Sequence, residues 1–242
     1  MNSSHRNRSD YDHYPFLNKD EFAEICHQLD NRYCQATLGP VRKQWKLRVH
    51  TALDMLFGGD SEHTTFVQIT RPLEEDADLD ELESCFDNFS MGDSNDVAQG
   101  IDMAMEIVTD PEEHIKRPPQ PSFGHVRYEI HLHPTYRAPC LWFSLHDLPA
   151  GEASFDIDTV FRRLVPDQFK SILRGVGPIG GISADHHPVT GVPSFFVHPC
   201  FLGDAMAEFD CSKEDYLMVW LGLVGGCVGL WVPKEMALNS SG

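Results

Sequence analysis

The first regular pattern of apolar residues along the chain has the period of a helix. Four apolar residues stand at positions i, i+3, i+4 and i+7: Phe22, Ile25, Cys26 and Leu29. This spacing lines one face of an α-helix. Asn18 precedes the stripe and Glu21 follows Asn18 by three positions, which is the arrangement of a capping box at a helix N-terminus. The pattern predicts a helix that begins after Asn18 and buries one apolar face.

Alternating apolar and polar residues predict strands further along the chain. The segments with this pattern are residues 45–50, 65–70 and 125–133, and we also expect strands at 141–145 and at the short apolar run 194–197. In 125–133 one face is apolar: Val126, Tyr128, Ile130 and Leu132. The opposite face is polar: Arg127, Glu129, His131 and His133. A proline-containing turn at 134–137 separates this strand from the next, so we expect the two to form an antiparallel hairpin.

Helical spacing returns at residues 156–164, and a further helix is expected near Asp204. The succession of helix, strands, hairpin, helix, strand and helix predicts an α+β fold. In such a fold, helices pack on one face of a mostly antiparallel sheet. We expect a single domain over residues 15–242, preceded by a polar, disordered tail over residues 1–14.

The negative charge of the chain is concentrated in one segment. The formal net charge is −18, yet no Lys or Arg lies between Arg71 and Lys116, where fifteen of the 37 acidic residues occur. The remainder has 37 − 15 = 22 acids against 19 bases, a net charge of −3. We predict a flexible acidic insert over residues 72–122, with a short helix near 96–108, which either stays solvated or meets a basic partner surface. The missing basic footprint argues against nucleic-acid binding.

Cysteine usage indicates the redox environment. The chain has seven cysteines, an odd number, and no C-x-x-C pair. We find no secretory signal, so we expect reduced thiols and a cytoplasmic protein.

An uncharged run over residues 216–232 is seventeen residues long, the lower limit for crossing a bilayer. Gly222, Gly225, Gly226 and Gly229 give this run the small-x-x-x-small spacing of membrane helices. The pattern leaves two hypotheses open: a membrane anchor, or a helix buried on all sides of a globular core and ended by Pro233.

One cysteine stands in a setting suited to nucleophilic chemistry. The apolar run 194–197 leads into His198, Pro199 and Cys200. Pro199 fixes the backbone before the cysteine, and His198 brings an imidazole near a thiol whose thiolate is the reactive form. We expect Cys140, within a strand, and Cys227, within the apolar run, to be buried and inert.

Four stretches of the chain resemble the autophagy ubiquitin-like-conjugating enzymes, and specifically the autophagy-related protein 10 family. The tripeptide His198-Pro199-Cys200 is similar to their active-site tripeptide. The second stretch is the hairpin, Tyr128-Glu129-Ile130-His131 together with Tyr136-Arg137-Ala138-Pro139-Cys140-Leu141-Trp142-Phe143. The third is His187-Pro188 with the residues that lead from it to Cys200, and the fourth runs from Trp220-Leu221-Gly222 to Pro233. His186 departs from the Glu that the family commonly has before His-Pro.

The resemblance implies a ubiquitin-conjugating-enzyme-like fold and a two-step transfer. Cys200 would take the modifier, autophagy-related protein 12, as a thioester from the activating enzyme, autophagy-related protein 7. A lysine of autophagy-related protein 5 would then receive it. The His-Pro-Asn motif of ordinary ubiquitin-conjugating enzymes is missing, so His198 and Tyr136 are candidates for polar help at the thioester. The resemblance also implies that the C-terminal run belongs to the folded enzyme, without stable membrane insertion. We expect no cofactor and no metal.

Other hypotheses remain at this point. The sister enzyme, autophagy-related protein 3, shares the tripeptide and an acidic insert. A zinc site or a non-catalytic adaptor is a further alternative, although the spacing of a structural zinc motif is missing. The residues available to zinc are His131, His133, His186, His187, His198 and Cys200. A cysteine protease is disfavoured, because the local protease signatures are missing.

Overall fold

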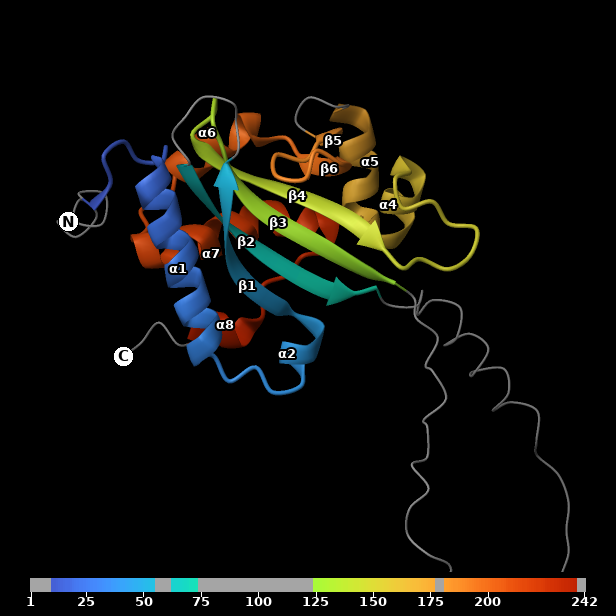
Figure 1. Cartoon of the computed structure of the whole chain (residues 1–242), viewed down its shortest axis with the longest axis horizontal. Coiled ribbons are helices and arrows are strands. Elements are labelled where there is room, and N and C mark those ends of the chain that lie inside the picture. The colour runs from blue at the N-terminus through green and yellow to red at the C-terminus, as the bar shows by residue number, and fades with distance from the viewer. Residues whose placement is uncertain (1–9, 55–61, 74–123, 177–180, 239–242) are drawn as a thin grey trace, which may run out of the picture. The chain divides into compact units, whose positions relative to one another are not determined.

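The computed structural model describes residues 10–54, 62–73, 124–176 and 181–238 (Figure 1). Residues 74–123 lie outside this range, and with them almost all of the predicted acidic insert and its short helix.

The first helix forms as the capping pattern predicts. Helix α1 spans Lys19–Gln35, and the Glu21 backbone N–H donates to Asn18 Oδ1 at 2.8 Å. In return, the Asn18 backbone N–H donates to Glu21 Oε2 at 2.8 Å. The two bonds satisfy backbone donors that the helix itself leaves unpaired, and the predicted apolar stripe is buried.

Six strands form one antiparallel sheet. They are β1 (Lys46–Asp54), β2 (Glu62–Pro72), β3 (His125–His133), β4 (Ala138–His146), β5 (Ile182–His186) and β6 (Pro193–Val197). Their order across the sheet is β1-β2-β3-β4-β6-β5. Strands β2 and β3 are neighbours although the residues outside the described range separate them in the sequence, since Pro72 is paired with His125. Together with the helices described next, this mostly antiparallel sheet confirms the predicted α+β class.

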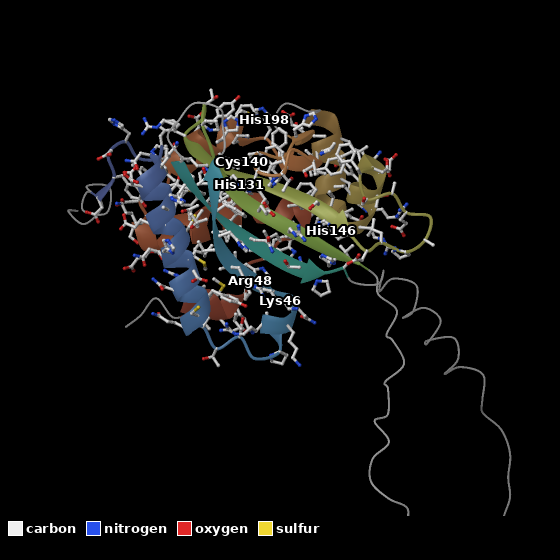
Figure 2. The ribbon with its side chains drawn as sticks, in the orientation of Figure 1. Lys46, Arg48, His131, Cys140, His146 and His198 are labelled. Carbon is white, nitrogen blue, oxygen red and sulfur yellow. The ribbon has the colours of Figure 1, made fainter. Side chains whose placement is uncertain are left out.

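The two faces of the sheet have different surroundings. On one face, Val67, Tyr128 and Phe143 join the main core, which α1 and α7 (Lys213–Val224) cover (Figure 1). The other face, here called the open face, carries the polar side of β3. Figure 2 labels side chains from three of its strands: Lys46, Arg48, His131, Cys140 and His146.

Shorter helices complete the fold. They are α2 (Val41–Gln44), α4 (Ile157–Arg163), α5 (Asp167–Val176), α6 (Leu202–Ala207) and α8 (Lys234–Leu238). Helix α4 confirms the helix predicted at 156–164; Asp156 caps it, because its carboxylate accepts from the Thr159 backbone N–H at 2.9 Å.

Residues 10–14 differ from the expected tail. Tyr11 is buried in the core, and the Tyr14 hydroxyl donates to the carbonyl oxygens of Met206 and Phe209, at 2.7 and 2.6 Å. These contacts attach the segment to the region of α6. The predicted tail boundary at residue 14 is therefore wrong for residues 10–14, because two aromatic rings give this polar stretch a packing surface.

The uncharged C-terminal run does not form one helix. Helix α7 ends at Val224, a 3₁₀ turn, η3 (Gly225–Val228), follows, and Gly229 takes a positive φ of 68°. Leu223 is 39% exposed, so the expectation of a helix buried on all sides is also wrong. Within the described residues, no helix has both the length and the apolar character needed to cross a membrane.

Candidate active site around Cys200

Strand β6 brings Cys200 to one end of the sheet. Phe195 and Val197 are paired with Phe143 and Leu141 of β4, and both are buried in the main core. Three residues after Val197, the chain reaches Cys200 in the short 3₁₀ helix η2 (Pro199–Phe201). The cysteine is thus held close to a buried, paired strand, as the apolar run 194–197 predicts.

The loop around Cys200 is fixed by its own residues. Pro199 is buried, whereas Cys200 is half-buried and Phe201 is 63% exposed. The Cys200 backbone N–H donates to His198 Nδ1 at 3.2 Å, and the His198 backbone N–H donates to the Gly181 carbonyl oxygen at 3.0 Å. Since Nδ1 accepts, the neutral ring of His198 carries its proton on Nε2. His198 therefore caps η2 and keeps a second nitrogen available as a donor.

Two further rings border this loop. Tyr136 lies edge-on to His198, with centroids 5.7 Å apart, and His133 lies 4.7 Å from Tyr136. Burial, and next the nearby His198, lower the pKa of His133, which favours its neutral form. The structure thus brings His198, Tyr136 and Cys200 into one region, as expected. It adds His133, which the sequence pattern placed only on the polar face of a strand and among possible zinc ligands.

The other cysteines have different environments. Cys140 is fully buried, and burial raises the pKa of its thiol to about 12; burial also raises the pKa of Cys26. Cys227 is only half-buried, so its expected full burial is wrong, although burial still raises its pKa to about 11. Cys34 is exposed at the C-terminal end of α1. Exposure alone therefore does not single out Cys200; its hydrogen bond to the His198 ring, which in turn contacts Tyr136, does.

Comparison with known proteins identifies the family. The family described as "Autophagocytosis associated protein, active-site domain" matches residues 21–235. A relative from Gibberella zeae, "Ubiquitin-like-conjugating enzyme ATG10", is 57% identical over 234 residues, covering 94% of this chain and 99% of the relative. The chain belongs to the ATG10 family. A human protein named "Ubiquitin-like-conjugating enzyme ATG10" is 29% identical over 134 residues, 48% of this chain and 54% of its own length.

Membership in the ATG10 family confirms the predicted class of activity, a ubiquitin-like-conjugating transferase of autophagy. The family match also covers the C-terminal run, which the structure shows folded into α7, η3 and the segment after it.

The possible zinc ligands separate into groups in this ATG10-family fold. His198 contacts the Cys200 backbone, His133 contacts Tyr136, and His186 is exposed at the end of β5. Within the described residues, the one set of potential ligand atoms that converges is Glu129, His131 and His187, with all three atoms within 4.8 Å of one another.

We call this set the Glu129 cluster. Its hydrogen bonding places a proton on the imidazole nitrogen that a metal ion would need as a ligand. His187 Nδ1 accepts from the backbone N–H groups of Val189 and Thr190, each at 3.3 Å. The neutral His187 ring must then carry its proton on Nε2, which lies 2.8 Å from Glu129 Oε2. A metal on Nε2 would require that proton to move to Nδ1, which faces two N–H donors.

The Glu129 carboxylate is ionised despite its burial. Burial alone raises the pKa of Glu129, but hydrogen bonds from His131 and His187 outweigh it and hold the pKa at about 2. His131 Nε2 lies 3.0 Å from the same oxygen, and burial lowers the pKa of His131. At neutral pH the cluster therefore holds an ionised Glu129 carboxylate beside a neutral His131 ring.

These pKa changes predict acid sensitivity of the fold. The ordinary pKa of His is 6.5, and that of folded His131 is lower, so below pH 6.5 the unfolded chain binds a proton that the folded chain does not. We expect the free energy of unfolding to fall as the pH drops below 6.5, with a slope of up to about 1.4 kcal/mol per pH unit from this ring. A second loss follows below pH 4.5, the ordinary value for Glu, down to about 2, where folded Glu129 is protonated.

Urea unfolding at pH 7.5, 6.5 and 5.5 measures the first loss. The His131→Gln variant has no ring to protonate in either state. The slope of its free energy of unfolding against pH should therefore be smaller than that of the wild type, by the equivalent of up to one bound proton. An equal slope for both proteins would contradict the assignment of this effect to His131.

Proposed function

We propose that this enzyme carries a ubiquitin-like modifier as a thioester on Cys200 and passes it to a lysine of an acceptor protein. The observation that carries the proposal is the position of Cys200, half-buried in a proline-fixed loop beside His198 and Tyr136. Such a thiol is reachable by a large protein substrate, and its surroundings supply polar hydrogen atoms.

The proposed chemistry has two acyl-transfer steps. In the first, the Cys200 thiolate attacks the modifier's thioester carbonyl on the activating enzyme; a C–S bond forms to Cys200, and the activating enzyme's thiolate leaves. In the second, a lysine amine attacks the new thioester carbonyl, Cys200 leaves as a thiolate, and the amine loses a proton as the isopeptide bond forms. Thiolate is both a good nucleophile near neutral pH and a good leaving group.

Each step passes through a tetrahedral oxyanion that hydrogen-bond donors stabilise. The backbone N–H of Cys200 is already engaged by His198 Nδ1. We therefore assign the donor role to the two rings that contact each other at this loop, through the His198 Nε2–H and the Tyr136 hydroxyl. Pro199 keeps the loop in the conformation that presents Cys200, because its ring restricts φ.

The partners follow from the family. We propose that autophagy-related protein 7 is the activating enzyme, autophagy-related protein 12 the modifier and autophagy-related protein 5 the acceptor. We also place the reaction in the cytoplasm. Supporting this, Cys34 is exposed and Cys200 and Cys227 are half-buried as thiols, a state that a reducing compartment maintains.

The proposal is tested by incubating the purified chain with the activating enzyme, ATP and one modifier at a time. A reductant-sensitive band, larger by the mass of the modifier and formed with autophagy-related protein 12, is expected on a non-reducing gel. Adding the acceptor should convert this band into a reductant-resistant conjugate. Loading with lipid-linked modifiers instead would assign the chain the activity of the sister enzyme, and no adduct with any modifier would refute the thioester.

A further inference from the structure

Glu129 and His187 lie outside the Cys200 loop, yet both belong to the stretches that resemble the ATG10 family. Glu129 is on the open face of β3 and is 9% exposed. An ionised carboxylate in such a position is costly unless hydrogen-bond donors surround it. His131, from the same strand, and His187, from the turn between β5 and β6, supply these donors.

His187 is held from both sides. Its backbone N–H donates to the Val192 carbonyl oxygen at 2.9 Å, and its carbonyl oxygen accepts from the Gly191 N–H at 2.9 Å. Its ring lies edge-on between His131 and Trp142, with centroid distances of 5.0 and 5.6 Å. The ring is therefore part of the turn's own structure and points its Nε2–H at Glu129.

The hairpin of β5 and β6 needs such an attachment because its pairing with the sheet is short. Only three residue pairs join β6 to β4, Leu141–Phe143 with Phe195–Val197, and β5 lies at the outer edge. A cavity of about 360 Å³ lies between the turn and the end of β4; Thr190, Val192 and Pro193 line it opposite Ser144 and His146. Side-chain packing against β4 is thus incomplete on this side of the turn.

The hairpin has the turn with His187 at one end and the loop with Cys200 at the other. We propose that Glu129 is a positioning residue for Cys200: through its bond to His187 it fixes the β5–β6 hairpin on the sheet, and through β6 it sets the position of the Cys200 loop. Without this bond the hairpin can pivot about its three-pair ladder with β4. The inference rests on the proposed function of Cys200 but is tested independently of it.

The test uses the full-length protein, four single variants and one double variant. Glu129→Gln keeps the shape of the side chain but replaces the ionised oxygen that accepts from both imidazoles with a neutral amide oxygen, which is a weaker acceptor. His187→Ala removes the donor, and His187→Gln retains one N–H directed at Glu129. The matched control is His186→Ala, since the neighbouring His186 is exposed.

Hydrogen exchange and cysteine alkylation measure the position of the loop directly. In Glu129→Gln and His187→Ala we expect the amides of residues 193–200 to exchange about tenfold faster, with those of α1 and α7 unchanged. Alkylation of the half-buried Cys200 by iodoacetamide should accelerate by a similar factor. His187→Gln should be intermediate and His186→Ala unchanged. The Glu129→Gln/His187→Ala double variant should be no worse than His187→Ala alone, because His187→Ala already removes the bond that Glu129→Gln weakens.

Transfer of the modifier from Cys200 should slow by about tenfold or more in the same two variants, since small misplacements of reacting groups are costly. The proposal would be overturned if exchange became uniformly faster over the whole chain, or if exchange at residues 193–200 did not become faster. The proposal would also be overturned if one Zn²⁺ bound tightly per chain and slowed hydrogen exchange of residues 187–200 in the wild type but not in Glu129→Gln. If the wild type accepts no modifier while the exchange pattern holds, the proposed function fails and the positioning of the loop stands.

Discussion

Replacing Cys200 with Ala should abolish loading of the modifier and formation of the isopeptide conjugate. The expected loss is complete, because no other group can take part in the acyl transfer that we propose for this thiol. The fold should survive, since Cys200 is half-buried and lies outside the main core. Thermal unfolding of the variant, together with the non-reducing loading assay, separates loss of chemistry from loss of structure.

Cys200→Ser gives a sharper result. An alkoxide is a poorer leaving group than a thiolate, so an oxyester, once formed, should accumulate and resist attack by lysine. The wild-type adduct should disappear with reductant, whereas the Ser adduct should persist in reductant and break in alkali.

Two other cysteines serve as matched controls. Cys34→Ala removes an exposed thiol, and Cys140→Ala removes a buried one at a cost of about 1 kcal/mol for the small cavity. Both variants should load normally. A reductant-sensitive adduct on Cys200→Ala would show that another thiol carries the modifier.

Local patterns predicted much of this fold because each depends on neighbouring residues. The capping box at Asn18 and Glu21 fixed the start of α1, and period-two alternation identified β3, where Val126, Tyr128 and Ile130 face the core. The position of Cys200 was also predictable, since a buried strand followed by a proline leads to a short, restricted loop.

Contacts between distant segments were not predictable in this way. His187 reaches Glu129 across 58 positions, and neither residue shows in its local pattern that the other will lie beside it. Alternation placed Glu129 and His131 on a polar face, yet both are buried, with His187 from the turn after β5 in contact with each of them. His133 joins Tyr136 and His198 for the same reason, because the turn after β3 returns toward η2.

The C-terminal run shows how one composition supports two structures. Four glycines among apolar residues are typical of packed membrane helices, yet here the chain turns back on itself after α7, and three of the four, Gly225, Gly226 and Gly229, lie in that turn. The Leu230 backbone N–H donates to the Gly225 carbonyl oxygen at 2.9 Å. A Cβ on residue 225 would overlap the Leu230 carbonyl oxygen, a backbone atom that cannot move aside alone.

Gly225→Ala should therefore destabilise the protein strongly. Gly225 has ordinary helical dihedrals, φ −68° and ψ −38°, so the expected cost is the steric overlap and not a backbone preference. Overpacking of this kind costs about 3 kcal/mol, which for a domain of this size lowers the melting temperature by about 6–12 °C. Differential scanning calorimetry of the full-length protein measures the change.

Gly222→Ala is the matched control, three residues earlier in α7. A Cβ there meets nothing within 4 Å, and alanine is about 1 kcal/mol better than glycine inside a helix. This variant should therefore melt higher than the wild type by about 2–4 °C. The two substitutions are chemically identical but should change the melting temperature in opposite directions. One glycine is needed for a close approach of backbone to backbone, and the other is not. In a membrane helix whose glycines all served helix packing, both would weaken the protein, so destabilisation by Gly222→Ala would contradict the fold of this segment.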